Sequence, residues 1–183
     1  LPPDPEALRA PERRGKVVVA GQRVGDTSML YNYGDPIAVR TGYPTMILPN
    51  PGTFDGGDGE RRWIEHTREI VTRTRDPIDH NYFRLAIPYL RALDVFAEVL
   101  GTREIRAVIG GHSKRATSAF TAAAIDPERI VGLVYMGNES VFASLEAEPL
   151  RAISPYHTQQ YVRCPVLYIG ATNINTAQGV VFG

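Results

Sequence analysis

The sequence predicts an α/β domain built on a mostly parallel sheet that helices cover on both faces. Two observations predict this class. Short, nearly continuous apolar runs rich in Val and Ile recur along the chain, and segments with helical periodicity separate them. Strands of this kind belong to parallel sheets that are buried on both faces. A chain of 183 residues is long enough for one such domain with a sizeable core.

The first elements follow a polar arm. Residues 1–15 are rich in proline and charge and are expected to form an arm or linker, so the domain is expected to span residues 16–183. The run KVVVAG predicts a strand at 16–21, and a loop rich in Gly, Asn and Asp is expected up to Tyr43. The run TMILP then predicts a second strand at 45–49, followed by turn residues.

Two amphipathic helices are expected next. Residues 60–73 place five side chains on one helical face: Trp63, Ile64, Thr67, Ile70 and Val71. Around residues 84–100, apolar side chains recur at spacings of three and four: Phe83, Ile87, Leu90, Leu93, Phe96, Ala97 and Leu100. Pro88 either starts or kinks the regular part of this helix, and Gly101 is expected to end it.

The second half alternates strand and helix. A third strand is expected at 105–111, a small-residue helix at 113–125 and a fourth strand at 131–137. Residues 138–160 are mixed and are expected to form short helices and loop, before a fifth strand at 164–170. This alternation favours successive strand–helix–strand units in one parallel sheet.

Composition excludes several functions. The chain carries 20 basic and 20 acidic residues and no basic block, so we expect no nucleic-acid partner. Its apolar runs are too short for a membrane span. Cys164 is the single cysteine, so no intrachain disulfide forms. No metal or other cofactor is expected, because zinc-binding motifs are missing and DGGDGE at 55–60 is more typical of a turn than of a calcium loop.

The stretch GGHSKRA places Ser113 between the third strand and the helix that follows it. In the α/β-hydrolase nucleophile elbow, a serine on such a sharp turn is exposed at the carboxyl edge of the sheet. Gly111 stands two residues before Ser113; Arg115 stands two after it, where glycine is usual, and the small Ala116 comes one step later. The alternatives are a serine that only caps the helix and a phosphate site at the helix start.

Several motifs resemble the PhoPQ-activated pathogenicity-related family of α/β-hydrolases. They are RALD at 91–94, GHSKRA at 111–116, and TAA at 121–123 with DPERI at 126–130. The resemblance covers roughly residues 16–172 and departs from the family at Ala116, where the family has glycine. The glucuronoyl esterases are more distantly similar. The resemblance implies a serine hydrolase. It also implies an extracytoplasmic setting, and no other feature of the sequence indicates a compartment.

The resemblance also implies the roles of residues around Ser113. Ser113 attacks the carbonyl of a small-molecule or carbohydrate ester and forms an acyl-enzyme. The main-chain N–H of Lys114 is one expected oxyanion donor, and the second is expected near Gln22 or Arg23, after the first strand. Lys114 and Arg115 either hold an anionic group of the substrate or are solvated side chains at the start of a helix.

In this fold the acid and then the histidine follow the serine in the chain. Asn173 occupies the usual acid site after the fifth strand, so Glu139, after the fourth strand, is the candidate acid. The sequence leaves open a residue near Asn173 as the acid, with Glu139 as an ordinary loop carboxylate. All four histidines precede the fifth strand: His66, His80, His112 and His157. His157 is the candidate base inside the chain.

Two accounts of the missing base stay open. The first places the catalytic histidine beyond Gly183, since a start at Leu1 and an end in NTAQGVVFG lead us to expect a domain that is incomplete at its C-terminus. The second is a catalytically inactive hydrolase-fold protein that binds or signals. The sequence leaves the natural substrate and the oligomeric state open.

Overall fold

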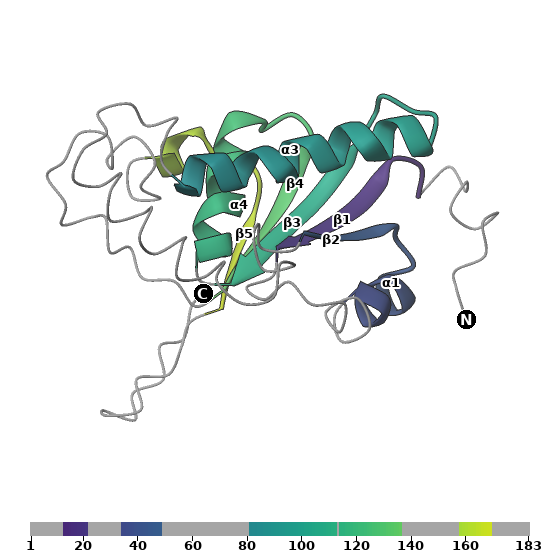
Figure 1. Ribbon diagram of the computed structural model, residues 1–183, viewed down its shortest axis with the longest axis horizontal. Helices are drawn as coiled ribbons and strands as arrows, with labels where there is room; N and C mark the ends of the chain where they lie inside the picture. The colour runs from purple at the N-terminus through teal and green to yellow at the C-terminus, as the bar shows by residue number, and fades with distance from the viewer. Residues whose placement is uncertain (1–12, 22–33, 49–80, 113, 137–157, 170–183) are drawn as a thin grey trace, which may run out of the picture.

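One parallel five-stranded sheet organises the computed structural model (Figure 1). The structure describes residues 13–21, 34–48, 81–112, 114–136 and 158–169. The strands are β1 (Lys16–Gly21), β2 (Thr45–Leu48), β3 (Arg106–His112), β4 (Ile130–Met136) and β5 (Val166–Ile169). They lie in the order β2-β1-β3-β4-β5, and all neighbouring pairs are parallel. The predicted fold class is confirmed, and each expected strand is present with ends that differ by at most two residues.

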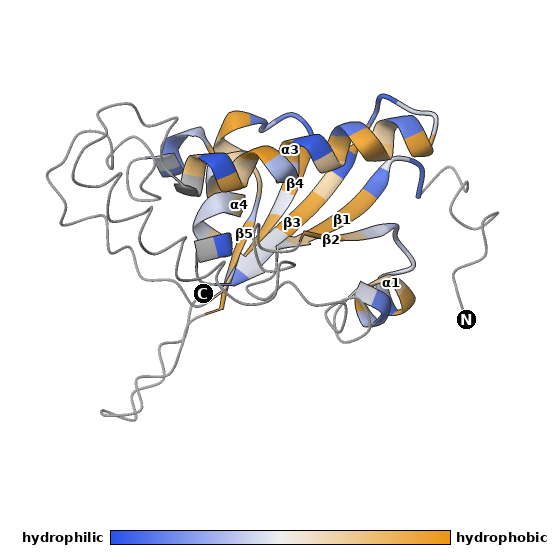
Figure 2. Cartoon of the chain, in the orientation of Figure 1, coloured by the Kyte–Doolittle hydropathy of each residue, from blue (hydrophilic) through white to orange (hydrophobic). Residues whose placement is uncertain are grey.

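Two helices cover one face of the sheet. They are α3 (Asn81–Val99) and α4 (Lys114–Ile125), which contact each other and the central strands. Alternate strand residues such as Val19, Ile109 and Leu133 point into this layer and are almost fully buried. Figure 2 shows hydrophobic residues along the strands and alternating hydrophobic and hydrophilic bands along α3. None of the helices in the described ranges is long and apolar enough to cross a membrane.

The buried stripe of α3 differs from the one expected from spacing. Its buried residues are Leu85, Ala86, Tyr89, Ala92, Leu93 and Phe96. Ile87 was expected on the apolar face, but it is 45% exposed because residues 85, 86 and 89 turn the stripe away from it. Pro88 lies inside the helix, so the expectation that regular helix starts there is wrong.

Gly101 ends α3 as expected. Its φ is 61°, in the left-handed region where glycine meets no steric penalty. Its N–H donates to the Glu98 carbonyl at 3.2 Å, and the Thr102 N–H donates to the Ala97 carbonyl at 3.0 Å. This pair of bonds is a Schellman motif, which satisfies carbonyls at the end of the helix.

The short helix α1 (Asp35–Thr41) was not predicted, since the sequence indicated a loop up to Tyr43. Pro36 stands at its first turn, and Gly42 ends it with φ 67°. None of its seven residues is buried, so it has no apolar stripe that periodicity could detect. The helix expected at 60–73 lies outside the described residues. Most of the expected mixed segment 138–160 also lies outside them, and its described end enters η5 (Gln159–Tyr161), a 3-10 turn.

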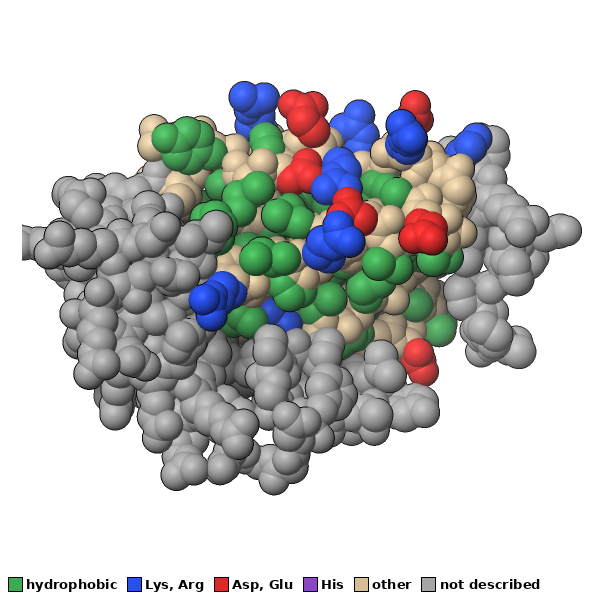
Figure 3. Space-filling view, turned by 45° about the horizontal axis from the view of Figure 1, so that its top comes forward, with side chains coloured by type: hydrophobic (Ala, Val, Ile, Leu, Met, Phe, Trp, Pro, Cys, Tyr) green, Lys and Arg blue, Asp and Glu red, His purple; other side chains and the backbone are tan. Residues whose placement is uncertain are grey.

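The surface over α3 carries charges of both signs. Figure 3 shows acidic and basic side chains interspersed with apolar ones on this face. Three of them tie α3 to the start of β4: Asp94 accepts from Arg129 at 2.8 Å, and Arg129 also donates to Asp126 at 2.6 Å. This cluster fixes the helix layer at the amino ends of the strands. The carboxyl end of β3, after which Ser113 follows in the sequence, lies at the opposite edge of the sheet.

Candidate functional site

The strand order singles out one edge of the sheet. After β1 the chain passes to β2 on one side, and it then returns to β3 on the other side of β1 (Figure 1). In open parallel sheets, ligands bind beyond the carboxyl ends of the strands at such a reversal. Here the ends of β1 and β3 are neighbours, because Gly21 pairs with Gly111. Topology alone therefore places a candidate site where β3 ends.

Ser113 itself lies outside the described residues, but both of its neighbours are described. His112 is the last residue of β3 and Lys114 is the first residue of α4. The change from strand to helix is therefore complete within one residue. This is the strand–serine–helix order that an elbow requires.

Gly111 shows how tightly the chain turns. A Cβ atom added at Gly111 would lie 2.6 Å from both the carbonyl carbon and the oxygen of Arg115. The first turn of α4 is therefore packed directly on the end of β3, and only glycine fits at position 111. Ala116, where the resembled family has glycine, is 0% exposed, so alanine fits within this packing.

Arg115 lies inside the protein. It is 0% exposed, and its guanidinium donates to the Leu48 carbonyl at 3.1 Å and to the Leu85 carbonyl at 3.4 Å. The expectation that Arg115 is a solvated side chain is wrong, because this side of α4 faces the sheet and α3. The other expectation, that Arg115 binds an anionic group of the substrate, stays a prediction.

Tyr89 completes this cluster and was missed by the sequence analysis. Its hydroxyl donates to the Gly110 carbonyl at 2.9 Å and lies 3.3 Å from the Arg115 carbonyl, and its ring centroid is 5.7 Å from the Arg115 guanidinium carbon. Burial raises the pKa of Tyr89, so the hydroxyl stays protonated and remains a donor. The available signal was a tyrosine in a buried helix, since a buried tyrosine hydroxyl needs a partner.

The remaining candidate residues are placed only through the strands that precede them. Gln22, Arg23, Glu139 and His157 lie outside the described residues, and only the main chain of Lys114 is described. The strands that lead to Gln22, Ser113 and Glu139 are adjacent in the sheet, since β3 pairs with both β1 and β4. The structure thus brings together the strand ends from which these three segments leave.

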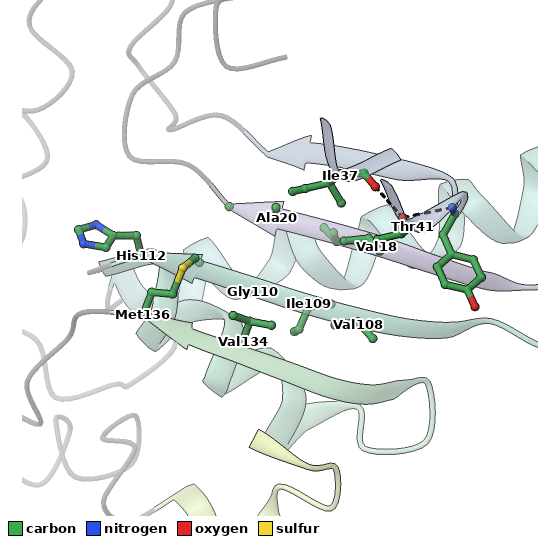
Figure 4. A pocket seen from close by; sticks show the side chains of 14 residues that line it. Val18, Ala20, Ile37, Thr41, Val108, Ile109, Gly110, His112, Val134 and Met136 are labelled. Atoms are coloured by element: carbon green, nitrogen blue, oxygen red, sulfur yellow. Dashed lines mark hydrogen bonds between the residues drawn. The ribbon is translucent and has the colours of Figure 1, made fainter. Parts of the chain in front are cut away.

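The face of the sheet away from α3 and α4 holds an apolar groove of about 790 Å³ (Figure 4). Its floor is formed by alternate residues of β1, β3 and β4: Val18, Ala20, Val108, Gly110, Val134 and Met136. At one side Ile37 and Thr41 of α1 line it, and His112 lies at its carboxyl end. Parallel sheets are covered on both faces. Among the described residues the lining of the groove is mostly apolar, with Thr41, Tyr43 and His112 as its polar members, so this face of the sheet is suited to packing.

The parallel sheet with its reversal of strand order and the tight turn at Gly111 fit an α/β-hydrolase-type fold, and solved structures share this fold. The chain is similar to acetyl xylan esterase 1 from Thermoanaerobacterium sp. JW/SL YS485, with 13% identity and a TM-score of 0.54 over 84% of this chain and 58% of that one. It is also similar to S-formylglutathione hydrolase (FrmB) from Staphylococcus aureus, with 10% identity and a TM-score of 0.51 over 92% of this chain and 70% of that one.

A third similar structure is FphF, a fluorophosphonate-binding serine hydrolase of Staphylococcus aureus. The identity is 11% and the TM-score 0.50, over 86% of this chain and 64% of that one. The chain thus spans less than two thirds of the length of two of these three proteins. At such identities the likeness shows the fold alone. No family model matches the sequence, and no curated protein matches it.

Proposed function

We propose that the protein is a serine hydrolase that cleaves an ester through an acyl-enzyme on Ser113. The observation that carries this proposal is the close approach of Arg115 to Gly111, which packs the start of α4 on the end of β3 around position 113. A serine that only caps the helix needs no such packing, and the glycine pattern of a phosphate-binding turn is missing from this stretch. A nucleophile elbow needs this packing, because the strained turn exposes the serine hydroxyl at the edge of the sheet.

In the proposed reaction the Ser113 hydroxyl attacks the ester carbonyl, its proton passes to a base, and the alcohol leaves. Water then attacks the acyl-enzyme and releases the acid. The N–H of Lys114 and an N–H near Gln22 or Arg23 hold the oxyanion, each worth about 3–4 kcal/mol to the transition state. The pairing of Gly21 with Gly111 supports this assignment, because both donor segments begin at neighbouring positions.

Glu139 is the proposed acid and His157 is the candidate base within this chain. Support for Glu139 comes from β4, whose Met136 pairs with His112 at the carboxyl end of β3. Support for His157 is limited to its position beside Thr158 and η5, which contacts α4. Lys114 is proposed to contact an anionic group of the substrate, since it directly follows Ser113 in the sequence.

The finer family assignment is also a proposal. GHSKRA and the meeting of RALD with DPERI support membership of the PhoPQ-activated pathogenicity-related family, with an extracytoplasmic setting. RALD and DPERI lie together in the folded chain, because Arg129 of DPERI donates to Asp94 of RALD and to Asp126. One structural neighbour is named as an acetyl xylan esterase, which supports a small-molecule or carbohydrate ester as the substrate.

Replacing Ser113 with Ala tests the nucleophile. Wild-type protein is expected to hydrolyse p-nitrophenyl acetate and to gain one fluorophosphonate adduct at Ser113, and the variant is expected to lose both. Ser118→Ala is the matched control, because it makes the same change five residues further along the chain, within α4, and is expected to keep the adduct. Unchanged hydrolysis in Ser113→Ala would sink the assignment. A wild-type protein with neither activity would favour the alternative, an inactive hydrolase-fold binding or signalling protein.

A further inference from the structure

The first turn of α4 contains a buried charge two residues after Ser113. Arg115 is 0% exposed, although arginine is among the residues least often found fully buried. Burial lowers the pKa of its guanidinium, yet arginine stays protonated in proteins. A buried charge is costly unless hydrogen bonds compensate it. A leucine or methionine would fill the same space without that cost. The structure must therefore gain something from the guanidinium that an apolar side chain would not provide, and its directed hydrogen bonds are that gain.

The hydrogen bonds of Arg115 reach two other elements at the carboxyl edge of the sheet. Its guanidinium donates to the carbonyl of Leu48, the last residue of β2, and to the carbonyl of Leu85 in α3. The planar fork of guanidinium donors bonds two carbonyls on different elements in one fixed geometry. The side chain therefore ties the start of α4 to β2 and α3 at once.

Tyr89 ties the same turn to the two central strands. Its hydroxyl donates to the Gly110 carbonyl of β3, lies 3.3 Å from the Arg115 carbonyl, and lies directly against Gly21 of β1. Its ring packs 5.7 Å from the Arg115 guanidinium carbon. A Cβ added at Gly21 would lie 1.8 Å from this hydroxyl, so the hydroxyl keeps this position only when residue 21 is glycine.

We propose that Arg115, held by Tyr89, is the positioning residue of the nucleophile turn. It fixes the first turn of α4, and with it the Lys114 N–H and the main chain of residue 113, against the ends of β1, β2 and β3. The proposal rests on the proposed function, because it concerns the placement of a reacting serine. It replaces contact with an anionic substrate as the role of Arg115.

A positioning role predicts a kinetic effect that a purely stabilising role does not. A small displacement of a nucleophile and its oxyanion donor slows the chemical step while substrate binding is retained. We therefore expect Arg115→Lys and Tyr89→Phe to lower kcat by about tenfold to a hundredfold per folded molecule. The KM is expected to stay close to the wild-type value. The rate of fluorophosphonate labelling is expected to fall by the same factor as kcat.

Arg129 provides the matched control. It too is an arginine that joins separate elements, through Asp94 and Asp126, but it does so at the opposite ends of the strands. Arg129→Lys is expected to lower the midpoint of thermal unfolding and to leave kcat and the labelling rate unchanged. In Arg115→Ala, millimolar guanidinium chloride is expected to restore labelling, and Arg129→Ala is expected to show no such rescue.

The experiment separates the two proposals. If the wild-type protein labels and Arg115→Lys and Tyr89→Phe label at its rate while only their thermal midpoints fall, the positioning role is overturned and Ser113 keeps its function. If the wild-type protein neither turns over nor labels, the proposed function fails and the positioning role fails with it. Arg115→Lys and Tyr89→Phe make small changes, so the test does not depend on whether Arg115→Ala folds.

Discussion

Two glycines at the carboxyl edge of the sheet mark where main chain and side chains meet most closely. Gly21 faces the hydroxyl of Tyr89, and Gly111 faces the main chain of Arg115. The two obstacles differ in kind, because the end of a side chain can move aside more readily than the main chain of a helix. Gly111 is therefore the less replaceable of the two.

Gly111→Ala is expected to destabilise the protein by about 1–3 kcal/mol or more, because its methyl group would overlap the Arg115 carbonyl. The start of α4 must then shift, so fluorophosphonate labelling of Ser113 is expected to be lost as well. Urea unfolding followed by circular dichroism, together with intact-mass labelling, measures both effects.

The control for this change is Gly101→Ala. Gly101 has φ 61° and open space around its Cα, so alanine there brings only backbone strain of about 1–2 kcal/mol. It is expected to lower stability and to keep labelling. A Gly111→Ala protein with wild-type stability and labelling would refute the close approach.

At the scale of elements, α3 and the start of β4 meet through charged side chains. Asp94 is 41% exposed and accepts hydrogen bonds from Arg129 and Arg91, each at 2.8 Å. The hydrogen bond from Arg129 lowers the pKa of the Asp94 carboxyl, and Arg91 adds to the effect. The carboxylate is thus stabilised in the folded state relative to the unfolded chain.

Asp94→Asn is therefore expected to lower the free energy of unfolding at pH 7, by less than about 1 kcal/mol because the pair is partly exposed. A lowered carboxyl pKa contributes stability above the unfolded-state pKa, and this contribution is lost as the pH falls through the folded-state pKa. The difference between wild type and variant should accordingly shrink as the pH drops below the ordinary range of aspartate. Glu98→Gln, on the same helix but outside this cluster, is the control, and an equal difference at pH 7 and pH 3 would contradict the prediction.

Local signals predicted most of the elements. The strand KVVVAG and the stop at Gly101 follow from β-branched residues and from glycine chemistry, and both are found where expected. Helix α1 gave no signal, because a seven-residue helix without a buried side chain has no hydrophobic period. The prediction that Ile87 lies on the buried face of α3 was wrong. Tyr89 is buried on that face instead, and its hydrogen-bond partners come from β3 and α4, which spacing along the helix does not reveal.

The candidate site was less predictable than the fold. The sequence showed that Ser113 stands between a strand and a helix, but it could not show that Arg115 turns inward. That outcome depends on carbonyl groups at Leu48 and Leu85, which are distant in the chain. The meeting of the RALD and DPERI segments is equally a property of the folded chain, since residues 91–94 and 126–130 touch only through tertiary packing.

At the scale of the whole molecule, the inner strands of the sheet make more hydrogen bonds and core contacts than its periphery. Strands β1 and β3 each pair on both sides, and their inward side chains lie under α3 and α4. Helix α1 lies at one side of the opposite face and buries none of its residues. Stability is therefore expected to be uneven across the fold.

Native-state hydrogen exchange should reveal this difference. Amides of β3 are expected to exchange through global unfolding, and those of α1 through local opening, with exchange about a hundredfold or more slower in β3. Two-dimensional NMR of the exchanging protein measures both sets of amides in one sample, so each set controls for the other. Similar protection in α1 and β3 would show that α1 is part of the cooperative core.

The central position of β1 also bears on how the protein is made. Lys16 pairs with Arg106, so residues 17–105 must be synthesised before the central pair of strands can form. At typical translation rates that interval lasts roughly 5 to 20 seconds. During it the apolar segment VVVA lacks its β3 partner, and unpaired strands with exposed apolar surface make a nascent chain prone to aggregate. Nascent chains of this protein are therefore expected to depend on chaperones that hold the amino-terminal strand until β3 emerges from the ribosome.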